Sequence, residues 1–108
     1  MSKVEREFEA AALVQYARAK SAGYQDERYS QMLDEIGARA AAKDLVGAGR
    51  IQGMFARLAG DGRFELILEW LMLRPQFQEL FEPAELEEAR RRLNASGCRD
   101  PLPIGSGT

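Results

Sequence analysis

The sequence contains no histidine among its 108 residues. Histidine is the commonest general acid or base in enzymes and the commonest metal ligand, and the Ser-His-Asp and Cys-His catalytic arrangements depend on it. Its absence removes all of these chemistries. Since no other motif supplies catalytic, cofactor-binding or metal-binding residues, we expect a protein that is not an enzyme and carries no cofactor or metal.

Cysteine occurs only once, as Cys98, so the chain cannot form an internal disulfide. This usage fits a reducing compartment. The chain opens with Met1-Ser2-Lys3 and runs into charged sequence, without the apolar stretch of a secretory signal. We therefore predict a cytoplasmic protein, in which Cys98 is an exposed thiol in a loose tail rather than a nucleophile.

Neither sign of charge is in large excess, since 15 basic and 17 acidic side chains leave a net charge of −2. A dedicated nucleic-acid binder needs basic groups to neutralise phosphates. Ala19, Gly23 and Tyr29 do fall near the spacing of a helix-turn-helix, but the supposed recognition helix over 25–35 carries four acids and one arginine. We therefore expect no direct, specific DNA binding.

Long apolar runs are also lacking, and the strongest one extends only from Phe64 to Leu73. At about 15 Å this run is too short to cross a bilayer, which needs roughly 20 apolar residues. Its apolar residues would lie on every side of a helix, which predicts a central helix covered on all sides. The helix must end near Arg74, because Pro75 disfavours helical geometry in the residue before it.

The remaining patterns predict an all-α protein, a compact bundle of five or six short helices around the central helix at about 64–73. Asp26 is an expected N-cap, Gly23 is an expected helix end, Gly37 is a candidate break within the second helix, and Pro83 is an expected first helical residue. The expected helices are 3–22, 26–40, 44–59, 64–74, a short helix from Pro75, and 84–94. We predict one domain over residues 1–95 and a flexible C-terminal tail over 96–108.

Several local patterns have both a chemical and a structural interpretation. The glycines of the segment 47–53 do not form a dinucleotide fingerprint, because Gln52 stands where a glycine is required and no strand precedes the segment. Glu65 and Glu69 lie one turn apart, but carboxylate metal sites in helical bundles normally recruit histidine. We expect these two glutamates to reach solvent or to pair with Arg63 or Arg74.

Two further features are interpreted as structural. Trp70, the only tryptophan, is expected in the core, although tryptophan is also enriched at binding hot spots. The run Arg90-Arg91-Arg92 is expected to form a solvated face with the nearby glutamates rather than a phosphate site.

The C-terminal half contains a recognisable combination of elements. These are Gly62-Arg63, the Leu-rich run, Pro75 followed by Phe77, the pair Leu80-Phe81, and a closing Ala-Arg-x-Arg-Leu pattern in 89–93. Together they resemble a C-terminal helical module of small bacterial and phage proteins, and the likeness covers about a third of the chain. In size, helical character and lack of histidine, the whole chain is also similar to phage-encoded anti-CRISPR proteins.

The leading functional hypothesis is a small non-enzymatic inhibitor of phage or mobile-element type. It would occupy the surface of a larger host protein or ribonucleoprotein complex, such as a CRISPR–Cas surveillance complex. Its candidate contact residues are Asp26, Glu27, Asp34 and Glu35, which would compete for an arginine-lined nucleic-acid channel. The alternative is a self-associating structural or regulatory module, a homodimer that buries the central helix and the segment of Phe77 and Phe81. A DNA-binding regulator is the third hypothesis.

Overall fold

Every regular element in the described part of the chain is helical, which confirms the all-α prediction. The computed structural model describes residues 1–49 and 53–98. In chain order the elements are α1 (Lys3–Ser21), α2 (Glu27–Ile36), α3 (Ala38–Gly47), α4 (Phe55–Gly60), the 3-10 helix η1 (Phe64–Leu66), α5 (Leu68–Met72), the 3-10 helix η2 (Pro75–Leu80) and α6 (Pro83–Ala95).

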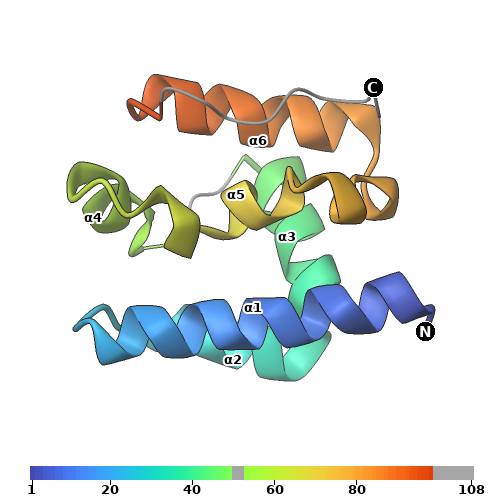
Figure 1. Ribbon diagram of the computed structural model, residues 1–108, viewed down its shortest axis with the longest axis horizontal. Helices are drawn as coiled ribbons and strands as arrows, with labels where there is room; N and C mark the ends of the chain where they lie inside the picture. The colour runs from blue at the N-terminus through green and yellow to red at the C-terminus, as the bar shows by residue number, and fades with distance from the viewer. Residues whose placement is uncertain (50–52, 99–108) are drawn as a thin grey trace.

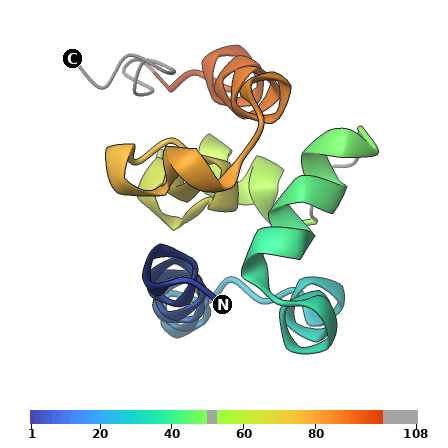
Figure 2. The same ribbon diagram turned by 90° about the vertical axis from the view of Figure 1, so that its right-hand side faces the viewer.

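The helices form three layers. Helices α1 and α2 lie side by side in one outer layer, and α6 forms the opposite one (Figures 1 and 2). Between them lie α4, η1, α5 and η2, while α3 crosses from the α1–α2 layer towards α6 (Figure 2). The Cα radius of gyration is 12.7 Å, about that expected for a single domain of this length.

Local capping signals placed most helix boundaries correctly. The Asp26 side chain accepts a hydrogen bond from the Tyr29 amide at the start of α2. Gly23 has a φ of 98°, which favours glycine, and the amide of Tyr24 then bonds back to the carbonyl of Ala19. Pro75 and Pro83 begin η2 and α6 as expected.

The predicted central helix over 64–73 is broken in the structure. Ile67 is extended, with φ −98° and ψ 136°, and separates η1 from α5. The buried side chain of Gln15 donates to the carbonyls of Glu65 and Ile67, at 3.1 and 2.8 Å. The bond to Glu65 gives this carbonyl a side-chain donor at the break, and the bond to Ile67 adds to those that the amides of Trp70 and Leu71 donate to the same carbonyl. The segment still supplies much of the core, because Leu66, Leu68, Leu71, Met72 and Leu73 are buried.

The predicted helices over 26–40 and 44–59 are wrong. Gly37 ends α2 with a φ of 85°, and α3 begins immediately afterwards and ends at Gly47. The small buried residues Ala38, Ala41 and Ala42 make this segment a packed helix, since they allow close contact with α1. Helix α4 is a separate short element that starts at Phe55, and residues 50–52 of the glycine-containing segment lie outside the described residues.

The described start of the predicted tail is ordered by a helix cap. After α6, Gly97 has a φ of 97°, and the amide of Cys98 donates to the carbonyl of Leu93 at 2.9 Å. Cys98 is half-buried and packs against the core, so its interpretation as an exposed thiol in a loose tail is wrong. The rest of the predicted tail, 99–108, lies outside the described residues.

Candidate functional site

Helix α1 has two apolar faces. One is buried and consists of Phe8, Ala12 and Ala19 together with Gln15. The opposite face carries Ala10, Leu13, Val14 and Ala17, all exposed to solvent. The spacing of the exposed residues, i, i+3, i+4 and i+7, is that of a single helical face. The fold buries only one of these two apolar faces, so the other remains exposed to solvent.

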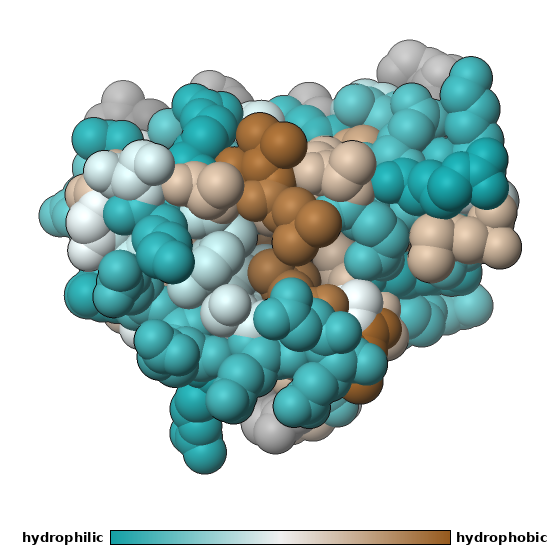
Figure 3. All heavy atoms as spheres, turned by 90° about the horizontal axis from the view of Figure 1, so that it is seen from below, coloured by the Kyte–Doolittle hydropathy of each residue, from teal (hydrophilic) through white to brown (hydrophobic). Residues whose placement is uncertain are grey.

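The exposed apolar residues continue from α1 towards α2. The exposed fractions are 55% for Leu13 and 60% for Val14 on α1, and 49% for Ile36 at the end of α2. Figure 3 shows a hydrophobic strip crossing this face of the molecule. A contiguous apolar surface bordered by polar residues is typical of a protein–protein contact. The outer face of α1 and α2 is therefore the candidate functional site.

Asp26, the first of the predicted contact residues, has a structural role. Its side chain caps α2, and its backbone amide and carbonyl form hydrogen bonds with the Tyr16 hydroxyl at 3.4 and 3.3 Å. A Cβ atom added at Gly53 would lie 2.8 Å from Asp26 Oδ2, so Gly53 approaches this carboxylate closely. This aspartate is half-buried and is less available to a partner than the sequence suggested.

The other three predicted contact residues are accessible to a partner from solvent. Glu27, Asp34 and Glu35 are exposed on α2, and none forms an ion pair with a residue in 1–49 or 53–98. They place negative charge on the same outer layer as the apolar strip (Figure 1). The structure thus brings predicted acids and unpredicted apolar residues onto one pair of helices.

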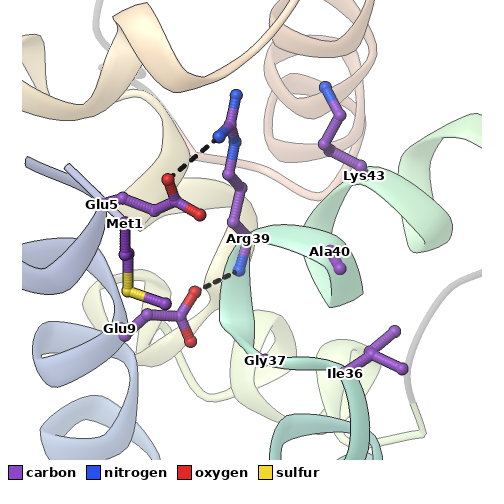
Figure 4. A pocket seen from close by; sticks show the side chains of 8 residues that line it. All are labelled: Met1, Glu5, Glu9, Ile36, Gly37, Arg39, Ala40 and Lys43. Carbon is purple, nitrogen blue, oxygen red and sulfur yellow. Dashed lines mark hydrogen bonds and ion pairs between the residues drawn. The ribbon is translucent and has the colours of Figure 1, made fainter.

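A cavity of about 310 Å³ lies where the start of α1 meets the α2–α3 corner. In Figure 4 the Arg39 side chain reaches Glu5, whereas Lys43 points away from both residues. Arg39 pairs with Glu5 at 3.2 Å, Lys43 pairs with Glu85 at 2.8 Å, and Glu9 accepts hydrogen bonds from the first amides of α3. Because these groups already have partners in the chain, the cavity shows no polar group reserved for a ligand.

A buried ion pair joins α5 to α6. Arg92 Nη1 lies 3.1 Å from Glu69 Oε2, and the exposed fractions of the two residues are 3% and 1%. Arg92 also donates to the Leu45 carbonyl at 3.0 Å and to Glu88 at 2.8 Å. The predictions that Glu69 reaches solvent or pairs with Arg63 or Arg74, and that Arg92 belongs to a solvated face, are therefore wrong.

The two glutamates bound to Arg92 have opposite pKa shifts. Burial raises the pKa of Glu69 above its ordinary value, although the hydrogen bond and charge of Arg92 oppose this. Hydrogen bonds from Arg91 and then Arg92 lower the pKa of Glu88 from 4.5 to about 2. This arrangement ties α3, α5 and α6 together.

Trp70 is only partly buried, which corrects the expectation of a core residue. The guanidinium carbon of Arg74 lies 3.5 Å from the centre of its ring, and Arg74 Nε donates to the Trp70 carbonyl. The ring of Trp70 thus packs against a cation four residues further along the chain, in the link between α5 and η2. Burial lowers the pKa of Arg74 below its ordinary value.

Leu13 and Val14 were missed by the sequence interpretation, which considered only one apolar stripe in α1. The signal was present, because Ala10, Leu13, Val14 and Ala17 repeat the helical spacing on the opposite side.

Comparisons with protein-family models, curated proteins and solved structures find no match to this chain.

The described residues contain no group of three or more acidic, cysteine or histidine side chains placed to hold a metal ion. The same part of the chain has no helix with the length and apolar character needed to cross a membrane.

Proposed function

We propose that the protein is a non-enzymatic interaction protein that acts by binding another protein through the outer face of α1 and α2. The observation that carries this proposal is the exposed apolar strip. Leu13, Val14 and Ile36 are about half exposed or more, while the other large apolar residues of these two helices are buried or partly buried. Covering such a surface is the favourable step in most protein association.

The charge on α2 indicates the chemistry of the partner. Glu27, Asp34 and Glu35 would meet basic side chains, and opposite charge around an apolar contact speeds association and selects the partner. Nucleic-acid-binding complexes present such basic surfaces. In this form of the proposal the protein is an inhibitor of a host complex, and the likeness to anti-CRISPR proteins makes a CRISPR–Cas surveillance complex the specific candidate.

Self-association is a second candidate function, through a different surface from the one expected. Phe77 and Phe81 pack edge-on against Phe8, with ring centres 5.2 and 5.3 Å apart, so this segment is used inside the chain. The residues of the broken central segment are likewise largely covered within the chain. The apolar surface left for a second copy is that of α1.

The proposal is tested with matched charge reversals. Partners are first recovered by affinity pull-down from the native host lysate and identified by mass spectrometry. The purified partner is then titrated with the wild type, with D34K/E35K, and with E79K/E87K, which makes the same charge change at exposed residues of η2 and α6. We expect D34K/E35K to weaken binding by roughly tenfold or more, mainly through slower association at low salt, and the control to bind normally.

Equal affinity for the two reversed variants would contradict the role of the α2 acids. Substitution of Leu13 and Val14 by serine tests the apolar strip separately. Retained binding by this second variant would show that the contact lies elsewhere.

A further inference from the structure

We draw no further inference here: the strongest candidate, the exposed apolar face of α1 with Leu13 and Val14 at its centre, belongs to the site already described, and nothing in the structure shows what covers it.

Discussion

Arg92 connects three parts of the molecule, through Glu69 on α5, the Leu45 carbonyl of α3 and Glu88 on its own helix. Two features of the sequence are consistent with this role. Arg92 lies three residues after Ala89 on the inner side of α6, and Glu69 lies within the most apolar run of the chain. Neither pattern shows that the two residues meet, because 23 residues separate them and tertiary packing decides the contact.

Removing Arg92 should be strongly destabilising. The variant R92A leaves the Glu69 carboxylate buried without its counter-ion, so we expect a loss of about 3–5 kcal/mol in the free energy of unfolding. The double variant E69L/R92M replaces the pair with apolar side chains and should lose much less. Urea denaturation of each variant provides the measurement.

The neighbouring variant R91A is the matched control, because Arg91 is exposed and pairs with the same Glu88. It should cost less than about 1 kcal/mol. If R92A were no more destabilising than R91A, the buried pair would not contribute as described.

Glu88 should make stability depend on pH in the acidic range. Its pKa is lowered from 4.5 to about 2 in the folded chain, so the carboxylate stabilises the fold above pH 4.5. That contribution is lost as the pH falls from about 4.5 to about 2. Thermal midpoints of wild type and E88Q should therefore differ above pH 4.5 and converge towards pH 2.

The comparison of the two proteins is needed because Glu69 shifts in the opposite direction and changes the wild-type curve as well. A difference in midpoint that stays constant between pH 2 and 5 would contradict the assignment to Glu88.

Helix boundaries that depend on neighbouring residues were predicted correctly, whereas features that depend on distant residues were not. The caps at Asp26 and Gly23 and the prolines at 75 and 83 act within a few residues, so they were predicted from the sequence. The break at Ile67 depends on Gln15, which is 52 residues away and buried against it. The second apolar face of α1 was readable from its spacing, whereas its exposure depends on which face the other helices cover.

Substitution by alanine should have opposite effects on stability at Gly37, which precedes α3, and at Gly47, which ends it. Gly37 stands at the α2–α3 corner with a φ of 85°, and an added Cβ would lie 3.1 Å from Glu9 Oε1. Gly47 is the last residue of α3, has no atom within 4 Å of an added Cβ, and is exposed. We expect G37A to destabilise the chain by more than about 1 kcal/mol and G47A to be neutral or stabilising by up to about 1 kcal/mol.

Chemical denaturation of each variant and of the wild type measures the change in the free energy of unfolding. Equal effects of G37A and G47A would show that the α2–α3 corner does not require its positive φ.

Exposed acidic and basic side chains occur together on α1 and on α2, so neither helix presents a surface of one sign. The net charge is −2, and the outer layer of α1 and α2 includes the exposed acids Glu27, Asp34 and Glu35. The α1–α2 corner has the spacing of a helix-turn-helix. The helix that would enter a DNA groove is α2, and its exposed acids would repel the phosphates. A protein surface of this kind gains little from releasing the counter-ions of DNA.

We therefore expect no duplex binding tighter than ordinary non-specific contact, with a dissociation constant of roughly 10⁻⁴ to 10⁻⁶ M at physiological salt. Fluorescence anisotropy of a labelled duplex, titrated with the protein at two salt concentrations, measures it. The variant D34K/E35K is a useful comparison, since added positive charge on α2 should strengthen the non-specific contact and its salt dependence. Nanomolar binding of the wild type to a defined duplex would contradict this prediction, and would assign the acidic face of α2 a role other than meeting a basic protein surface.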